Sequence, residues 1–394
     1  MRIEDQGFQQ ALAVLKSNAT KEGFRASSEI YNSIWGRDGS VICLGALLTG
    51  DDVLIQASRR TLLTLRDLQT PLGQIPNVLF LDSRRVDYYA VDATAWWLIA
   101  VNAFWRLTHD ERFLRSSKTA IKKAVTWLRY QSLDNTGLIN SPPSADWMDC
   151  SIQRWGRVFY NNVLYFRALA GLSDFGQEIE PVPGPDGADI ARRLNFLFWP
   201  ERPINREWLP SWDTTFYEQV IEPQREHYLN YLSFETYEDS CDVLANCLAV
   251  LWDIADSRKR AKILRYFRRN RLSNPFPIRV LHPPVLQPNM LWNPKIDLSR
   301  EHYWQNAPYC YHNASVWPWV GGFYVAALAK AGDRSAGREL VRLALANKAG
   351  RQGEWEFNEW LHGQTGEPSG AVRQSWSAAG YIIAYKAVLE GILL

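Results

Sequence analysis

The chain has 394 residues, and its 44 Lys and Arg residues against 42 Asp and Glu residues give a net charge of only +2 at pH 7. So small a net charge is not expected to steer the chain toward nucleic acids or anionic membranes, and the expected partner is a small, largely neutral molecule. With 18 Trp, 17 Tyr and 16 Phe, either the core or a pocket is unusually aromatic.

The cysteines and the amino-terminal segment indicate the cellular compartment. Five scattered cysteines (Cys43, Cys150, Cys241, Cys247 and Cys310) fit neither a disulfide framework nor a zinc site, and they are predicted to be reduced core thiols. The segment MRIEDQGFQQALAVLK has acids where a signal peptide has basic residues, and no apolar run reaches the roughly 20 residues of a membrane span. We expect a soluble, cytoplasmic protein with no membrane segment.

Helical periodicity recurs along the chain, whereas alternating strand patterns are nearly absent. Twelve helices are predicted, at residues 5–18, 38–50, 51–68, 92–107, 111–131, 157–176, 187–198, 239–256, 257–269, 315–331, 334–348 and 373–392. Short turns at 49–51 and 331–333 join neighbours into antiparallel hairpins. Six such hairpins would close a ring, and no stretch resembles an interdomain linker, so one domain over residues 1–394 is predicted.

Long connections alternate with these helices, and they are rich in Pro, Gly, Trp, Asn and charged residues. They lie at residues 69–91, 132–156, 199–238, 270–314 and 349–372. Loops of this length indicate function, and we expect them to gather on one face of the ring around a concave ligand site. The segment 199–238 is either a lid over the pocket or an oligomer contact, because it carries six large aromatics: Trp199, Trp208, Trp212, Tyr217, Tyr228 and Tyr231.

The first polar stretch of interest, YNSIWGRD, covers residues 31–38. An acid at a helix start, such as Asp38, favours the helix dipole, but this leaves Trp35 and Arg37 unexplained. A guanidinium beside a carboxylate matches the donors and acceptors of a vicinal diol, so Arg37 and Asp38 are candidates for binding sugar hydroxyls.

The second stretch, SADWMDCSIQRWG at residues 144–156, places Asp146 and Asp149 between Trp147 and Trp155. Burial raises the pKa of a carboxyl and makes a general acid possible near neutral pH, while an indole face can hold a sugar ring. The alternative is that one Asp caps a helix and the Trp residues fill the core.

The third stretch, at residues 302–306 and 311–319, mixes polar and aromatic side chains in a way that no hydrophobic core tolerates. Ser315 is the predicted N-cap of the following helix, with Pro318 in its first turn. His312 is either a structural or a catalytic histidine, and it has no neighbouring Ser or Cys for nucleophilic catalysis.

The fourth stretch, residues 354–368 followed by 374–379, places four glutamates near three tryptophans. Surface charge explains Glu359 poorly because Phe357, Trp360 and Leu361 surround it. One carboxyl from this loop and one from 144–156, brought to one pocket, is the arrangement that glycoside hydrolysis uses. No HExxH, P-loop or GxGxxG stretch is present, so we expect neither a metal nor a nucleotide cofactor.

Five short motifs resemble those of the (α/α)6-barrel glycoside hydrolases that include the amylo-α-1,6-glucosidases, the glucosidase part of glycogen-debranching enzymes. The motifs, in the family's order, are WGRDGS at 35–40, VDATAWWLIAV at 91–101, WMD at 147–149, YHNASVWPW at 311–319 and QSWSAA at 374–379. The resemblance runs from about residue 31 to the end of the chain. It implies an all-α fold, an (α/α)6 barrel whose long loops form the active-site face.

The related trehalases and the glucosidase-I and mannosylglycerate-hydrolase group are similar at Asp149-Cys150-Ser151 with Arg154-Trp155, and at Glu359-Trp360. That resemblance implies an inverting hydrolase with Asp149 as general acid and Glu359 as general base, Asp146 being the second choice for the acid. It also implies a sugar pocket formed by Trp35, Arg37, Asp38, Asp92, Trp147, His312, Asn313, Trp317 and Trp376.

The sequence departs from the debranching enzymes at Ala314, which replaces the Gly of their YHNG motif. We also expect no long amino-terminal domain of the kind that those enzymes carry. A small α-glycoside is therefore expected as substrate, either a saccharide or a glycosyl-polyol and most simply an α-glucoside cleaved from its end. The alternatives are an invertase, a sugar epimerase or isomerase that moves protons with histidines, and a non-catalytic sugar-binding protein. The sequence predicts no oligomeric state.

Overall fold

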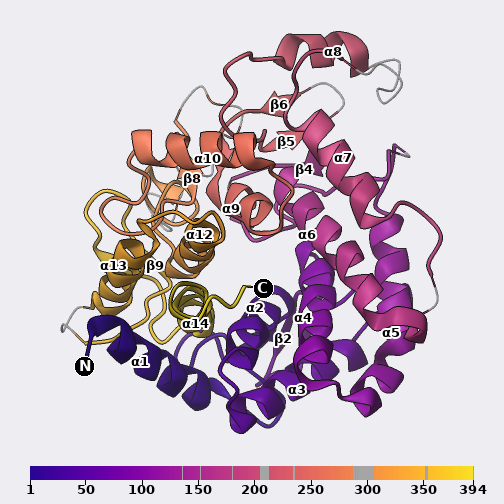
Figure 1. Ribbon diagram of the computed structural model, residues 1–394. Helices are drawn as coiled ribbons and strands as arrows, with labels where there is room; N and C mark the ends of the chain where they lie inside the picture. The colour runs from indigo at the N-terminus through magenta and orange to yellow at the C-terminus, as the bar shows by residue number, and fades with distance from the viewer. Residues whose placement is uncertain are drawn as a thin grey trace.

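The computed structural model of the protein is mostly helical, with its helices arranged around a ring (Figure 1). The structure describes residues 1–134, 136–150, 152–179, 181–204, 213–233, 236–286, 289, 291, 306–350 and 354–393. The predicted site stretch at residues 302–305, and Trp208 and Trp212 of the predicted lid, lie outside these ranges.

Six helices form the inner layer of the ring. They are α2 (Gly36–Leu47), α4 (Asp92–Thr108), α6 (Phe159–Ala170), α9 (Val243–Leu251), α12 (Pro318–Lys330) and α14 (Ser375–Leu389). Each packs against the next in this order, and α14 packs against α2, so the contacts form a closed cycle. Their sequences are apolar or small on nearly every side, as expected for helices that are covered all round.

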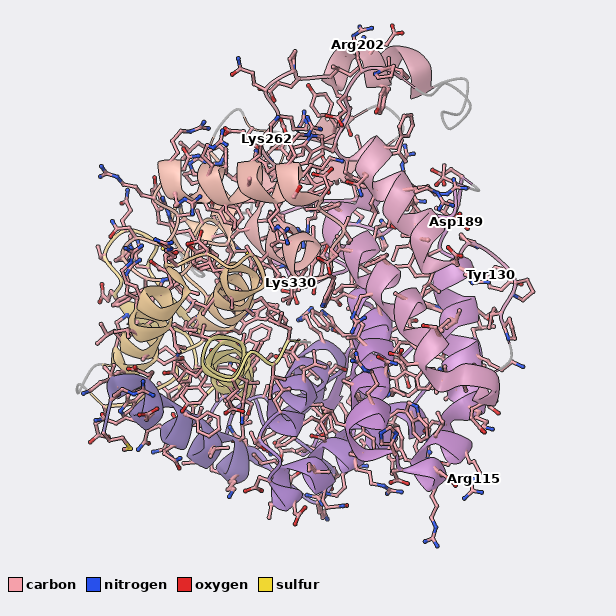
Figure 2. The ribbon with its side chains drawn as sticks, viewed as in Figure 1. Arg115, Tyr130, Asp189, Arg202, Lys262 and Lys330 are labelled. Carbon is pink, nitrogen blue, oxygen red and sulfur yellow. The ribbon has the colours of Figure 1, made fainter. Side chains whose placement is uncertain are left out.

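Six further helices lie outside this layer (Figure 1). They are α1 (Ile3–Asn18), α3 (Asp52–Asp67), α5 (Glu111–Arg129), α7 (Gly187–Leu197), α10 (Ser257–Arg269) and α13 (Ala336–Lys348). An apolar stripe on each faces inward and charged residues face solvent, and aspartate N-caps begin four of them. Figure 2 shows this charged exterior, with Arg115 and Asp189 among the labelled side chains at the rim.

Every one of the twelve predicted segments contains a helix. The structure adds α8 (Asp213–Val220) inside the segment 199–238, and the predicted helix 157–176 ends as a 3-10 helix, Gly171–Glu178. Helix ends differ from the predictions by a few residues, which is the expected scatter for boundaries read from sequence.

The prediction that Ser315 is the N-cap of α12 is wrong. The helix begins at Pro318, so Trp317 occupies the cap position, and the Ser315 hydroxyl donates to the carbonyl of Tyr311. Val316 pairs with Leu361 as an isolated β-bridge, which holds residues before Pro318 extended. Proline at the first helical position then fixes the start of the helix.

Short strands occupy the long connections. Within the described residues there are ten: β1 (Ser33–Trp35), β2 (Val78–Phe80), β3 (Val86–Asp87), β4 (Arg157–Val158), β5 (Tyr231–Leu232), β6 (Tyr237–Glu238), β7 (Cys241–Asp242), β8 (Leu281–His282), β9 (Trp360–Leu361) and β10 (Pro368–Ser369). They pair antiparallel in four small sheets. Because β1, β4 and β7 lead directly into α2, α6 and α9, these sheets fix the loops at the amino-terminal ends of inner helices.

The segment 199–238 contributes buried aromatic packing. Trp199, Tyr217, Tyr228 and Tyr231 are all buried, and Tyr228 stacks on Phe159 of α6 with ring centroids 4.5 Å apart. Helix α8 lies at the outer edge of the ring in Figure 1. These four aromatics therefore belong to the core, one of them, Tyr217, from α8 itself.

Two features bear on the compartment predictions. In the part of the chain that the structure describes, no helix has the length and apolar composition needed to cross a membrane. All five cysteines are free, and three of them, Cys43, Cys241 and Cys247, are buried.

Candidate functional site

A pocket opens at the amino-terminal ends of the inner helices. Its described wall consists of Tyr31, Trp35, Arg37, Asp38, Trp147, Asp149, Tyr311, His312, Trp317, Glu359, Gln374 and Trp376. The volume is about 50 Å³, and about 380 Å³ when the open space at its mouth is included. These residues come from both ends of the chain, and the closed cycle of inner helices brings them together.

Asp149 lies on this wall with about a third of its side chain (32%) exposed. Loss of hydration raises the pKa of its carboxyl to about 6, although the Arg37 guanidinium, 3.7 Å away, favours the ionised form. A carboxyl with this pKa can hold or release a proton near neutral pH.

Glu359 lies on a different strand-bearing loop, just before β9, and is only 5% exposed. The backbone amide of Ala371 donates to its Oε2 at 3.0 Å, and the Tyr31 hydroxyl donates to its Oε1 at 3.5 Å. Burial raises the pKa of Glu359 to about 7, helped by the negative charges of Asp38 and Asp149. Glu359 and Asp149 therefore interact electrostatically within one pocket.

Arg37 is the central cation of the site. Its side chain is 5% exposed and pairs with Asp38 at 3.5 Å and with Asp92 at 3.2 Å. Asp92 also accepts a hydrogen bond from the Tyr160 hydroxyl at 3.2 Å. Burial raises the pKa of Asp38 to about 6 against the opposing effect of Arg37. Three carboxyls thus share the described wall with one guanidinium, so the pocket favours neutral or cationic groups over anions.

Aromatic rings form the rest of the wall. His312 stacks on Trp317 with an interplanar angle of 19° and meets the edge of Trp147, and burial lowers its pKa far below the usual value. The imidazole is therefore neutral near pH 7 and cannot act as a strong proton donor. The indole nitrogens of Trp147 and Trp376 and the Gln374 carbonyl oxygen form no hydrogen bond with described residues. Buried polar atoms without partners are costly, and they are typical of a site that a polar ligand completes.

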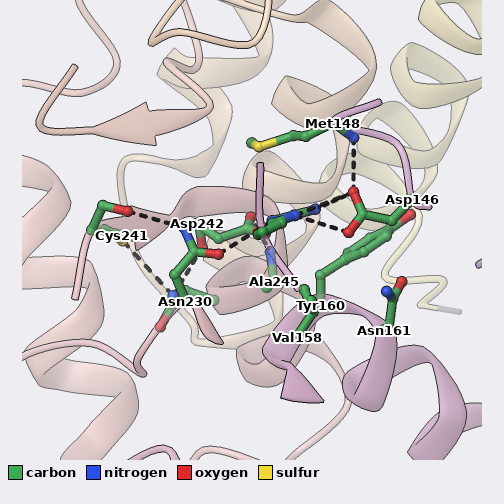
Figure 3. A network of polar contacts seen from close by, with 12 residues as sticks. Asp146, Met148, Val158, Tyr160, Asn161, Asn230, Cys241, Asp242 and Ala245 are labelled. Atoms are coloured by element: carbon green, nitrogen blue, oxygen red, sulfur yellow. Dashed lines mark hydrogen bonds and ion pairs between the residues drawn. The ribbon is translucent and has the colours of Figure 1, made fainter. Parts of the chain in front are cut away.

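A second polar network joins Asp146 to Asp242 (Figure 3). Arg154, with no side-chain exposure, makes a two-pronged contact with Asp146, at 2.9 Å from Nε to Oδ2 and 2.8 Å from Nη2 to Oδ1. The same guanidinium binds Asp242, the N-cap of α9. The ion pair therefore closes the base of the loop from residue 146 to residue 154 and fixes it to the end of α9.

The structure brings nine of the twelve predicted site residues onto one wall, and it places three elsewhere. Asp92 lies behind Arg37, Asp146 is the partner of Arg154, and Asn313 bonds to the backbone of Val285 with both amide atoms. Each of the three is buried and bonded to protein groups, and none belongs to the pocket wall. The described part of the segment 199–238 contributes nothing to this wall.

Three wall residues were missed by the sequence analysis: Tyr31, Tyr311 and Gln374. All three lie inside stretches already singled out, next to Asn32, His312 and Ser375. Their position within those motifs was the one sequence feature that could have identified them. Their side chains are uncharged, so their chemistry gave no reason to select them. Among the described residues, no group of three or more His, Cys, Asp or Glu side chains could hold a metal ion.

Comparison with known families shows to which family the chain belongs. The family description that matches the chain, over residues 9–383, is "Amylo-alpha-1,6-glucosidase". The chain belongs to the amylo-α-1,6-glucosidase family. The predicted resemblance is thus confirmed, and so, at the level of the family, is the prediction of a glycoside hydrolase.

Individual proteins similar to this amylo-α-1,6-glucosidase family member include a plant protein and two solved structures. A "Probable alkaline/neutral invertase D" of Arabidopsis thaliana is 27% identical over 343 residues, 76% of this chain and 60% of the relative. The chain therefore spans about 60% of that protein's length. A GH63 mannosylglycerate hydrolase from Thermus thermophilus, solved with glucose, superposes with a TM-score of 0.66 at 17% identity, over 95% of this chain and 98% of the other.

A bacterial glucoamylase solved with acarbose superposes with a TM-score of 0.60 at 13% identity, over 98% of this chain and 56% of the other. At these identities the two structures show a shared fold, and the substrate of the present chain must be argued from its own pocket.

Proposed function

We propose that the protein is an inverting glycoside hydrolase that removes a terminal sugar from a small α-glycoside, most simply an α-glucoside, with Asp149 as general acid and Glu359 as general base. The observation that carries this proposal is the pair of carboxyls with pKa values near neutrality on one indole-lined wall. Trp35, Arg37, Asp38, Trp147, His312, Trp317 and Trp376 would hold the sugar, with Asp92 acting through Arg37.

In the proposed reaction Asp149 donates its proton to the glycosidic oxygen as the bond to the anomeric carbon breaks. Glu359 removes a proton from a water that attacks the opposite face of that carbon, so the anomeric configuration inverts. This geometry requires a separation of about 6.5–9.5 Å between the two carboxyls, because a water must fit between base and sugar. At the end of one turnover the proton sits on Glu359, and its return to Asp149 through solvent resets the site.

The pKa values support a shared proton but do not assign the two roles. Near pH 6.5 the pair holds about one proton, as the reaction requires. The two values lie close together and the two carboxyls interact, so the shared proton belongs to the pair and not to one of its members. The assignment of Asp149 as the acid rests on the family resemblance and needs its own test.

The closed cycle of six inner helices, with six further helices outside it, supports an (α/α)6 barrel formed by one domain. A narrow pocket at one end of such a barrel fits a single sugar unit better than a polymer chain. The neutral partner expected from the net charge, a small saccharide or glycosyl-polyol, agrees with a wall that carries three carboxyls and one guanidinium.

The test of the mechanism compares Asp149→Asn and Glu359→Gln on two kinds of substrate. A panel of isomaltose, maltose, trehalose, sucrose, glucosylglycerate and mannosylglycerate identifies the natural bond. Loss of either carboxyl should lower kcat by about 10²-fold or more. α-Glucosyl fluoride needs no acid, because fluoride leaves without protonation, so Asp149→Asn should retain activity on it while Glu359→Gln should not.

Folding of both variants is checked by circular dichroism, and proton NMR of the first product formed gives the anomer. The reverse pattern on the fluoride would exchange the two roles. Release of the α-anomer would contradict inversion, and full activity of either variant on every substrate would remove that carboxyl from the mechanism.

An invertase activity is the second candidate, and the plant relative favours it. In sucrose the same wall could hold the glucosyl unit while fructose leaves. Hydrolysis of sucrose without hydrolysis of isomaltose or maltose would establish the invertase activity, and the reverse specificity would exclude it.

A further inference from the structure

A second cavity lies at the other end of the inner layer, away from the carboxylates. It has a volume of about 190 Å³, and its wall comes from the carboxy-terminal turns of α2, α4 and α6 and from Trp252 after α9. The residues Ile392 and Leu393 also line it, and Figure 1 shows the C-terminus in the middle of the ring. Cavities of about 150 Å³ lined by aliphatic side chains can bind a molecule the size of benzene.

The wall of this cavity is apolar except for two arginines. Leu44 and Ile99 are buried at its base and Leu107 is exposed at its edge. Arg106 and Arg167 stand in the last turns of α4 and α6. The guanidinium of Arg167 lies over the Trp252 ring at 6.0 Å.

Arg167 is partly buried, and it makes no ion pair or hydrogen bond with any residue that the structure describes. Arg106 forms a long ion pair with Asp174, at 3.7 Å. Lys330, which Figure 2 labels near the centre of the ring, is by contrast paired closely with Asp253, at 2.7 Å. Burial and the nearby charge of Arg106 lower the pKa of Arg167, and the negative charge of Asp174 offsets this only in part. A partly desolvated cation beside a second cation is costly unless an anion compensates it.

Helix dipoles explain part of this arrangement. Cations near the carboxy-terminal ends of α4 and α6 are stabilised by the negative ends of those helices. The last carbonyls of α6 accept hydrogen bonds from the Gly171 amide and the Ser173 hydroxyl, so Arg167 is not needed to satisfy them. The dipole does not explain why an apolar cavity adjoins this arginine. A guanidinium that forms no ion pair with a described residue, next to an apolar cavity, fits a ligand that has an anionic end and an apolar body.

We infer that this cavity binds a small amphiphilic carboxylate, whose carboxylate pairs with Arg167 and Arg106 and whose apolar part packs against Leu44, Ile99 and Trp252. The site is independent of the hydrolytic pocket, because the two lie at opposite ends of the inner helices. A planar guanidinium suits the two oxygens of a carboxylate.

The inference is tested by isothermal titration calorimetry with octanoate, and with octan-1-ol as the neutral analogue. The variants are Arg167→Met, which keeps the apolar length of the side chain, and Arg115→Met on the exposed face of α5 as the matched control. We expect saturable one-to-one binding of octanoate, weakened about tenfold or more by Arg167→Met and unchanged by Arg115→Met. Octan-1-ol should bind more weakly than octanoate to the unmodified protein.

Absence of saturable octanoate binding, or equal binding by Arg167→Met and the unmodified protein, would overturn the inference. If Arg167→Met fails to fold by circular dichroism, Ala103→Leu replaces it, because the larger side chain fills the cavity while both arginines remain. Octanoate binding should then be lost, and retention of full affinity in Ala103→Leu would refute the site.

Discussion

Three buried or partly buried acids of the pocket, Asp38, Asp149 and Glu359, share the wall with a single buried guanidinium, that of Arg37. Such a site has too few cations to neutralise its carboxylates, so desolvation dominates and all three pKa values rise. The same imbalance makes proton transfer possible near pH 7 and lowers the stability of the folded protein there.

Glu359 gives the clearest prediction at this scale. Its pKa rises from 4.5 in the unfolded chain to about 7 in the folded protein, so between these values the folded state binds more protons. The stability that protonated Glu359 contributes is complete below pH 4.5 and is lost as the pH rises through 7. Near pH 8 burial of the ionised group costs about 3 kcal/mol. Glu359→Gln should therefore raise the unfolding midpoint at pH 8 and change it little near pH 4.5.

The control for this measurement is Glu354→Gln, at an exposed position away from the pocket. Thermal unfolding of the three proteins at both pH values decides the matter. A midpoint for Glu359→Gln that is unchanged or lower at pH 8 would show that Glu359 is not a destabilising buried acid.

At the scale of elements, the loop from residue 146 to residue 154 is defined by the ion pair at its base. Asp146 and Arg154 hold the two ends of the loop together, and Asp242 ties Arg154 to α9 (Figure 3). Asp149 lies between these anchors, and its position on the pocket wall therefore depends on two residues that lie outside that wall.

Arg154→Met tests this dependence. The substitution keeps the apolar stem of the side chain but leaves Asp146 and Asp242 buried without a cation, which should cost about 3–5 kcal/mol of stability. At a temperature where the variant is folded, kcat should fall more than KM rises, because Asp149 is misplaced while the sugar-binding wall remains. Adding Asp146→Asn should recover part of the stability.

Chemical denaturation and steady-state kinetics supply these measurements. A loss of less than about 1 kcal/mol would place the network among the many ion pairs that contribute little. A kcat equal to that of the unmodified enzyme would show that the position of Asp149 does not depend on the ion pair between Asp146 and Arg154.

Sequence reasoning succeeded for elements whose pattern is local. The inner helices are apolar on every side and the outer ones amphipathic, so periodicity predicted all twelve. The strands were missed because two or three residues cannot display alternation. The N-cap at Ser315 failed because Val316 pairs with Leu361, a contact from a distant segment.

The same distinction applies to the candidate site residues. Charged residues in aromatic surroundings, such as Asp149 and Glu359, could be selected from the sequence. The residues alone could not distinguish Asp149 from Asp146, because only the structure shows that Asp146 is paired with Arg154 and already neutralised. Asp92 was likewise predicted as a sugar ligand, and the structure places it behind Arg37, whose guanidinium donates a hydrogen bond to it.

At the scale of the whole molecule, α14 closes the ring by packing between α12 and α2. The contact is close because it uses glycines: a Cβ atom placed on Gly322 would lie 2.2 Å from the carbonyl oxygen of Gly380. Similarly, a Cβ on Gly45 would lie 2.7 Å from the backbone of Ala379. Neither backbone contact can be relieved by a change of side-chain rotamer.

Gly322→Ala should therefore force α12 and α14 apart and cost about 1–3 kcal/mol or more, with a loss of activity because wall residues flank both helices. Gly337→Ala in α13 is the matched control. Its Cβ would meet nothing within 4 Å, so the change should stabilise the protein by about 0.5–1 kcal/mol through helix propensity alone. Urea denaturation of both variants measures the difference, and equal effects would show that the glycine contact does not limit closure of the ring.

The position of α14 also bears on synthesis of the protein. In sequence, the residues of the pocket wall run from Tyr31 to Trp376. Helix α14 packs on α2, although the two are separated by most of the sequence. A nascent chain can form its early hairpins while the ribosome still adds residues, but the apolar flanks of α2 and α12 stay uncovered until the final helix emerges. The pocket should therefore be completed only when α14 packs against α2 and α12. A ribosome that stalls before residue 375 would release a chain whose apolar inner helices are exposed to chaperones and proteases.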